Sequence, residues 1–151
     1  QDASFDIAIS MNVMNVFEDK VGLFREVRRV LRPGGTWAFL SGTFDFAPGD
    51  EEIRERLALG YAIPQYTDTL AGNKAKLREA GFVIDEVIEY ISEFRDTMQR
   101  WLEAWTRHRD AIAREQGEEQ TDYHIIYFTT YLAMIDAGKA SNHLVIAHRP
   151  E

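Results

Sequence analysis

The chain has 151 residues, of which 45% are hydrophobic and 12% aromatic, and this composition fits one globular domain with a sizeable core. Its 25 acidic and 17 basic residues give a net charge of -8, so a nucleic acid would meet a repulsive field and is not expected as a partner. The absence of cysteine excludes disulfides, thiolate zinc sites and cysteine nucleophiles. The sequence shows neither a secretory leader nor an apolar run of about 18 residues, so we expect a cytoplasmic protein that does not bind or span a membrane.

Residues 1–43 are expected to form a strand, a helix and a second strand. Residues 5–10 are almost continuously apolar, which is typical of a parallel strand covered on both faces. The next apolar residues are spaced by four, three and one, as on one stripe of a helix: Leu23, Val27, Val30 and Leu31. Pro33 cannot continue this helix, and the glycines after it can reverse the chain into a second strand over 36–41, parallel to the first.

Residues 44–66 mix glycine, proline and aromatic residues around a short acidic helix near 50–59, and we interpret them as a loop or lid. Residues 67–93 are expected to form a helix that ends at Gly81, followed by a third strand over 82–91. The candidate caps of this helix are Thr67, Asp68 and Thr69.

Residues 94–140 are expected to contain two helices, over 96–115 and 121–137, that together form a helical cover. The second helix is apolar nearly all round, which indicates that it is sandwiched between neighbours. Residues 141–151 read as a last strand, which Pro150 ends. No repeat or clear linker divides the chain, so a single domain is expected.

Four stretches of the sequence resemble a known family. "SFDIAISMNVMNVFED" and "LFREVRRVLRPGGTWAFLS" resemble the second half of a class I S-adenosylmethionine-dependent methyltransferase, in which an "FD" strand precedes a helix that ends in "R-x-L-(K/R)-P-G-G". "KLREAGFVIDEV" is similar to the next helix and the sixth strand of that family, and "NHLVIAHRP" to its final strand. The resemblance is continuous over 4–43 and patchier over 67–93 and 141–150.

This resemblance implies an α/β fold, the C-terminal part of a Rossmann-like methyltransferase fold. The family's strands would form a mixed sheet in the order 4-5-7-6, with strand 7 antiparallel and a helical insertion between strands 6 and 7. The family's glycine-rich cofactor turn is absent from the sequence, so we expect the chain to be a partial domain that begins in its middle. The strand at residues 5–10 would then be left at an edge, and we expect self-association or pairing through it.

The resemblance also implies S-adenosyl-L-methionine as cofactor and a small molecule as methyl acceptor. Ser10, Met11 and Asn12 lie at the carboxyl end of a parallel strand, where open α/β sheets bind ligands, and by the resemblance they would border the methionine end of the cofactor. Asn15 and Val16 would face the reaction side. The alternative interpretation is that Asn12 and Asn15 cap the helix, while Met11 and its neighbour Met14 fill the core.

Further candidate residues for the acceptor pocket are Ser41, which ends the second strand, and Tyr66; a simple turn after the strand is the alternative for Ser41. Many relatives carry histidine where Asn15 and Val16 stand, so the catalytic residue remains unknown. A free amine acceptor needs no base, whereas a hydroxyl or carbon acid does. His108, His124 and Tyr66 are then the candidate bases, each with a packing or surface role as the alternative.

Aromatic residues recur at a spacing of four in both helices of the cover: Trp101 and Trp105, then Tyr127 and Tyr131. They could line a substrate pocket, for which we select Trp101, Trp105 and Tyr131, and such a pocket would favour a cationic amine. The alternative is that they form the core of the helical pair. No metal is expected, because the carboxylates have no histidine pair or close Asp-x-Asp pattern beside them.

The sequence therefore predicts an S-adenosylmethionine-dependent methyltransferase acting on a small molecule, with nitrogen, oxygen and carbon all open as acceptor atoms. This chain would supply the acceptor pocket and part of the cofactor site, and alone it would be inactive. A non-catalytic binding or dimerisation module derived from the same fold is the alternative. A nicotinamide-dependent oxidoreductase is disfavoured, because the glycine fingerprint and a Tyr-x-x-x-Lys pair are missing.

Overall fold

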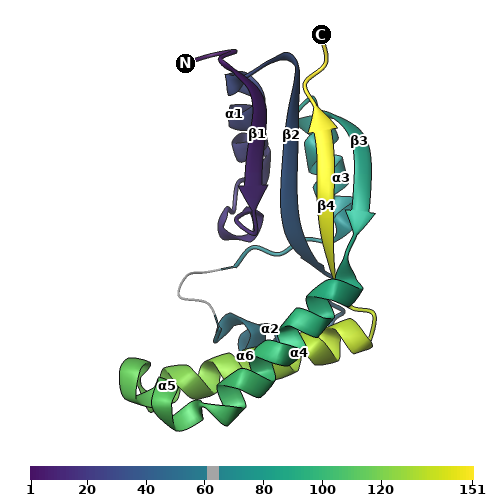
Figure 1. Cartoon of the computed structure of the whole chain (residues 1–151). Coiled ribbons are helices and arrows are strands. Elements are labelled where there is room, and N and C mark those ends of the chain that lie inside the picture. Colours follow the sequence, from purple (N-terminus) through teal and green to yellow (C-terminus); the bar gives the residue numbers. More distant parts are fainter. Residues whose placement is uncertain (61–64) are drawn as a thin grey trace. The chain divides into compact units, whose positions relative to one another are not determined.

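The computed structural model describes residues 1–60 and 65–151 (Figure 1). These residues form two compact units. The sheet unit contains Gln1–Phe44, Tyr66–Tyr90 and Ser141–Glu151, and the helical unit contains Asp45–Gln65 and Ile91–Ala140. Part of the loop or lid expected over 44–66, namely 61–64, lies outside the described residues.

The sheet unit is built on four strands in the order β1, β2, β4, β3. They are β1 (Phe5–Met11), β2 (Leu31–Phe44), β3 (Val83–Glu89) and β4 (Ala140–His148), and Figure 1 shows β1 and β3 at the two edges. The pair β1 and β2 is parallel, whereas β3 and β4 are antiparallel. The α/β class, the parallel first pair and this order of the four strands are as expected from the sequence.

The direction of β4 follows from its hydrogen bonds to β2. The Gly34 amide donates to the Arg149 carbonyl at 2.8 Å, and the Arg149 amide donates to the Gly35 carbonyl at 2.9 Å. The beginning of β2 therefore lies beside the end of β4, so the two strands run in opposite directions. This confirms the antiparallel last strand.

Two helices pack on one face of the sheet, α1 (Lys20–Val30) and α3 (Leu70–Glu79) (Figure 1). The core between them and the sheet includes Phe24 of α1, Leu77 of α3 and Trp37 of β2, all fully buried. The Phe24 and Trp37 rings meet edge to face with centroids 5.2 Å apart. Leu23 and Val27 of the predicted apolar stripe also pack against this core.

The Pro-Gly-Gly segment differs from its expected role as a corner between helix and strand. β2 begins at Leu31, directly after α1, and runs well beyond the predicted 36–41 at both ends. Its pairing with β1 shifts register between Leu31 and Thr36, so the segment forms an irregularity inside β2. Only Gly34 of the two glycines has a positive φ, +76°. Gly35 is needed for space, because a Cβ there would lie 2.8 Å from the Arg32 carbonyl oxygen.

One face of β1 is exposed, although the sequence is typical of a strand covered on both faces. Alternate side chains turn away from α1 and are 55 to 74% exposed: Phe5, Ile7, Ile9 and Met11. Ala8 lies on the other face and packs against the core. The apolar pattern of β1 is therefore only half used within the part of the chain that the structure describes.

The helical unit contains α2 (Glu51–Ala58), α4 (Ile91–Arg107), α5 (Arg109–Gln116) and α6 (Glu118–Asp136). α6 packs against each of the other three, which confirms that it is sandwiched. None of the described helices is both long and apolar enough to cross a membrane.

The prediction of a single helix over 96–115 is wrong, because α4 and α5 are separate helices that meet at His108. Arg109 provides a physical reason for the break. Its guanidinium donates to Asp122 and Glu118, both on α6, at distances of 2.8 to 2.9 Å. These contacts hold α5 against α6. The sequence has no proline or glycine at the break, so it contains no local signal that the helix is divided there.

Candidate functional site

The carboxyl end of β1 turns through an unusual backbone conformation. Asn12 has a φ of +53°, and its amide donates to the Leu40 carbonyl of β2 at 3.0 Å. Asparagine tolerates this left-handed region better than most residues, and such conformations are enriched at functional sites. The turn lies where open parallel sheets bind their ligands.

Ser10 and Met11, the two residues before this turn, differ in their surroundings. The Ser10 hydroxyl accepts a hydrogen bond from the Trp37 indole at 3.0 Å, so it helps to orient a core side chain. Met11 is 64% exposed, whereas Met14 is buried. The alternative interpretation as core residues therefore holds for Met14 and not for Met11.

Asn15 joins three segments at this edge of the sheet. It lies in a short 3-10 turn, η1 (Met14–Val16), and its side-chain amide donates to the Gly42 carbonyl at 3.1 Å. Its own backbone carbonyl accepts from the Tyr66 amide at 2.6 Å. The structure thus brings Asn15 and the backbone of Tyr66, both of the expected site, together with Gly42. Neither Asn12 nor Asn15 caps α1, because the Asp19 side chain does so by accepting from the Gly22 amide.

A buried ion pair, which the sequence did not reveal, supports this arrangement. The Lys20 ammonium lies 3.0 Å from the Asp68 carboxylate and 3.5 Å from the Asn15 side-chain oxygen, and only 1% of the Lys20 side chain is exposed. Asp68 also pairs with Lys76, and its backbone carbonyl accepts from the Phe44 amide at 3.0 Å. The pair therefore connects the first turn of α1 to the end of β2 and to the segment that carries Tyr66.

Burial and charge act against each other in this pair. Burial lowers the pKa of Lys20 below its ordinary value, and the hydrogen bond from Lys20 to Asp68 only partly opposes that shift. For Asp68, burial raises the pKa, but hydrogen bonds from Lys76 and Lys20 outweigh it, so the pKa falls overall. Asp68 is therefore ionised at neutral pH and supplies the charge that Lys20 needs.

Two further expected residues occupy the end of β2 and the segment after it. Ser41 is 3% exposed, and its hydroxyl donates to the neighbouring Gly42 carbonyl at 3.2 Å. Tyr66 is 37% exposed. Val16 is half-buried beside Asn15. Among these residues, Tyr66 therefore offers the most accessible side chain to a ligand.

A second polar cluster, also missed in the sequence, lies at the same end of the sheet. The Nδ1 atom of the buried His143 in β4 lies 3.3 Å from the Thr43 hydroxyl, and its Nε2 atom lies 3.6 Å from the carboxylate of Glu89 in β3. Burial lowers the pKa of His143, and Glu89 only partly opposes it. His143 is therefore neutral at pH 7, and its hydrogen bond to Thr43 lies within the sheet unit.

The remaining candidates belong to the helical unit. Trp101, which is half exposed, and Trp105 of α4 both pack on Phe128 of α6, with ring centroids 5.9 and 5.6 Å away. Tyr131 meets Tyr127 at 5.7 Å along α6 itself. This packing is what the interpretation as the core of a helical pair predicts, and the substrate pocket stays a prediction.

The two histidines proposed as bases also lie in the helical unit. His124 stacks on Trp105 with centroids 4.5 Å apart, and its Nδ1 atom lies 2.8 Å from the Gln120 carbonyl oxygen. His108 is exposed at the start of α5. Among the described residues, no group of three or more histidine, aspartate or glutamate side chains could hold a metal ion.

Comparison with known proteins agrees with the resemblance found in the sequence. The family model described as "Methyltransferase domain" matches residues 1–39. A cyclopropane synthase from Mycobacterium tuberculosis superposes with a TM-score of 0.85 at 14% identity, and the match covers 99% of this chain and 57% of that one. A putative sarcosine dimethylglycine methyltransferase from Galdieria sulphuraria gives 0.83 at 17% identity, covering 99% of this chain and 54% of that one.

A third match is a Haemonchus contortus phosphoethanolamine N-methyltransferase in complex with phosphomonomethylethanolamine and S-adenosylhomocysteine. Its TM-score is 0.80 at 18% identity, and the match covers 99% of this chain and 35% of that one. The fold is therefore that of class I S-adenosylmethionine-dependent methyltransferases, and the resemblance is confirmed. The chain spans between about a third and somewhat over half of the length of these three proteins.

Proposed function

We propose that this chain supplies part of the active site of an S-adenosylmethionine-dependent methyltransferase that acts on a small molecule. The observation that carries the proposal is the left-handed turn at Asn12, at the carboxyl end of a parallel strand in this fold. The related structure in complex with S-adenosylhomocysteine supports the choice of cofactor. Ser10, Met11 and Asn12 would border its methionine end.

The fixed geometry around Asn15 fits a reaction that depends on alignment. In methyl transfer, an electron pair of the acceptor attacks the methyl carbon while the bond to sulfur breaks, so position and in-line approach supply much of the catalysis. The Asn15 side-chain oxygen accepts from Lys20, and its side-chain nitrogen donates to the Gly42 carbonyl. The Asn15 backbone carbonyl accepts from the Tyr66 amide and so fixes the segment that carries Tyr66. Asn15 and Val16 would thus form a rigid wall of the acceptor site, together with Ser41 and Tyr66.

The acceptor atom decides whether a base is required. An amine acceptor with a free electron pair releases its proton to solvent after transfer, so a positioning site is sufficient. For a hydroxyl or a carbon acid, a base must remove the proton, and the exposed Tyr66 is the candidate in the sheet unit. We infer that the need for a base separates a nitrogen acceptor from an oxygen or carbon acceptor.

A second function, a non-catalytic binding or dimerisation module, is favoured by one observation. The exposed apolar face of β1 is typical of a surface that pairs with another polypeptide. Cofactor binding separates the two functions, because only the methyltransferase requires it.

The test is isothermal titration with S-adenosylhomocysteine. We expect no measurable binding by the 151-residue chain and clear binding by a chain extended at its amino end with the sequence encoded upstream. In the extended chain, Asn12→Val should weaken binding at least about tenfold, because a β-branched residue resists a positive φ. Asn12→Gly, which accepts that φ, should preserve binding.

Ala3 offers a matched control, since it is the other described non-glycine residue with a positive φ, +46°, and lies at the opposite end of β1. Ala3→Val should impose a similar backbone strain and leave cofactor binding unchanged. An extended chain that binds no cofactor, or one whose affinity is the same with valine at position 12, would contradict the proposal.

A further inference from the structure

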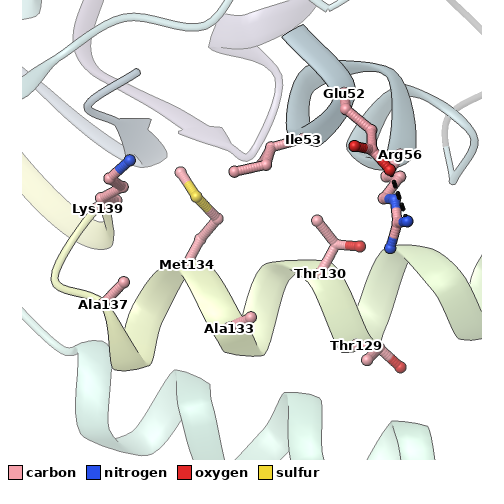
Figure 2. Close-up of a pocket in the computed structure, with 9 residues that line it drawn as sticks. All are labelled: Glu52, Ile53, Arg56, Thr129, Thr130, Ala133, Met134, Ala137 and Lys139. Carbon is pink, nitrogen blue, oxygen red and sulfur yellow. Dashed lines mark hydrogen bonds and ion pairs between the residues drawn. The ribbon is translucent and has the colours of Figure 1, made fainter. Parts of the chain in front are cut away.

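A cavity of about 430 Å³ lies between α2 and α6, within the helical unit (Figure 2). Its volume falls in the range of roughly 300 to 1,000 Å³ that is common for small-molecule sites. Nine residues line it: Glu52, Ile53, Arg56, Thr129, Thr130, Ala133, Met134, Ala137 and Lys139. None of them belongs to the sheet unit that carries the site around Asn12 and Asn15.

The middle of this cavity is apolar. Figure 2 shows the side chains of Ile53 from α2 and Met134 from α6 reaching toward each other across it. Ala133 and Ala137 form the floor on α6, and their small side chains leave the space open. An apolar group is therefore the best occupant of this part of the cavity, since it removes the apolar wall from water.

The charged side chains at the two ends of the cavity already have partners. The Lys139 ammonium lies 2.8 and 3.1 Å from the two carboxylate oxygens of Asp50, and Arg56 donates to Glu52 at 2.7 Å, the contact dashed in Figure 2. Each pair is neutral as a whole. A charged ligand would find no free counter-charge here and would lose its hydration, so the cavity favours a neutral ligand.

Thr130 supplies a polar group without a partner. It is only 8% exposed, and its hydroxyl has no hydrogen-bond partner among the residues that the structure describes. Three helical threonines, Thr97, Thr121 and Thr129, instead donate to the carbonyl four residues earlier, Thr129 to that of Ile125 at 2.8 Å. In Figure 2 the Thr130 side chain points from α6 toward α2. The hydroxyl itself is within reach of solvent, so it is available to a ligand in the cavity.

We propose that the cavity between α2 and α6 binds a small, neutral, mainly apolar molecule that carries one hydroxyl or carbonyl group. The apolar part lies between Ile53 and Met134, and the polar group forms a hydrogen bond with the Thr130 hydroxyl. A molecule of this chemistry is either the methyl acceptor itself or a separate effector. Binding does not require methyl transfer, so the proposal can fail or stand independently of the proposed function.

The probe for the test is benzyl alcohol, compared with toluene, benzylammonium and benzoate, which share its ring and differ in polarity and charge. Each is titrated into the chain labelled with ¹³C at its methionine methyl groups. We expect benzyl alcohol to shift the Met134 signal and to leave that of Met98 unchanged, because Met98 is buried in α4 and does not line the cavity. The two charged probes should bind at least about tenfold more weakly.

Variants locate the site and test the hydrogen bond. Ala133→Leu should fill the cavity and abolish the Met134 shift, and Ala137→Leu serves the same purpose if the first variant does not fold. Ala104→Leu, on the exposed surface of α4, is the control and should bind as the original chain does. Thr130→Val should weaken benzyl alcohol about 3- to 10-fold and leave toluene unchanged.

Thr129→Val is the control for the hydroxyl, since Thr129 also lines the cavity but already donates to Ile125. It should leave the preference for benzyl alcohol over toluene unchanged. The proposal is overturned if no probe shifts Met134, if Ala133→Leu binds as before, if a charged probe binds as tightly as benzyl alcohol, or if Thr130→Val has no selective effect. Incubation of the bound molecule with S-adenosylmethionine and an active, extended chain then distinguishes a methyl acceptor from an effector, because only an acceptor gains a methyl group.

Discussion

Lys20 occupies a position where a sequence alone would place an apolar residue. It lies three and four residues before Leu23 and Phe24, on the stripe by which α1 packs on the sheet. This spacing is the signal that could have revealed it, because a lysine on a buried stripe requires a counter-charge. Its partner Asp68 is 48 residues away and was considered only as a helix cap, a role that Thr69 fills. Only the fold brings the two charges together.

The dependence of Lys20 on Asp68 gives a prediction at this scale. Asp68→Asn should lower the free energy of unfolding by about 2–4 kcal/mol, because a nearly buried ammonium would lose its charged partner. Urea denaturation followed by tryptophan fluorescence measures the change.

Glu79→Gln is the matched control, since Glu79 pairs with Arg25 at 3.4 Å and both side chains are 60% exposed. Removal of this surface pair should cost less than about 1 kcal/mol. If the two variants lose the same stability, Lys20 does not depend on Asp68 for its charge balance.

At the scale of elements, local patterns predicted most of the structure and failed where tertiary contacts decide. The apolar stripe of α1, the cap of α3 at Thr69 and the short helix α2 all follow from nearby residues. The division between α4 and α5 does not, because apolar residues such as Trp105 and Ile112 continue the helical pattern across it. The extent of β2 was underestimated for a related reason: proline and glycine suggest a corner, but pairing with β1 and β4 accommodates them within a strand.

Gly35 tests this irregularity in β2. A Cβ at this position would lie 2.8 Å from the Arg32 carbonyl oxygen and 3.2 Å from that of Asp6, and both atoms belong to the backbone. Gly35→Ala should therefore lower the free energy of unfolding by about 1–3 kcal/mol, since neither atom can move without disturbing the strands.

The nearby Pro33 provides the control, because its side chain is exposed. Pro33→Ala should cost less than about 1 kcal/mol in the same denaturation measurement. Equal losses for the two substitutions would show that space around Gly35 is not limiting.

At the scale of the whole molecule, β1 combines a position at the edge of the sheet with an exposed apolar face. The strand has the apolar pattern of a fully covered strand, yet one of its faces is exposed in the described structure. The related structures are longer, and this chain matches only part of each. The sequence predicted self-association or pairing through residues 5–10, because the absence of the family's cofactor turn would leave this strand at an edge, and the prediction can be tested directly.

Sedimentation velocity over a range of concentrations provides the experiment. We expect the chain to associate as its concentration rises, because burial of the exposed residues on β1 gains hydrophobic free energy and hydrogen bonds at the free edge.

Ile9→Lys places a charge at the most exposed apolar position of β1, 74% exposed, and should shift the chain to a monomer. Trp101→Lys is the control, because Trp101 is 50% exposed on α4, in the helical unit, and its substitution should leave association unchanged. The prediction is contradicted if the chain stays monomeric at every concentration. It is also contradicted if association survives Ile9→Lys but is lost in Trp101→Lys.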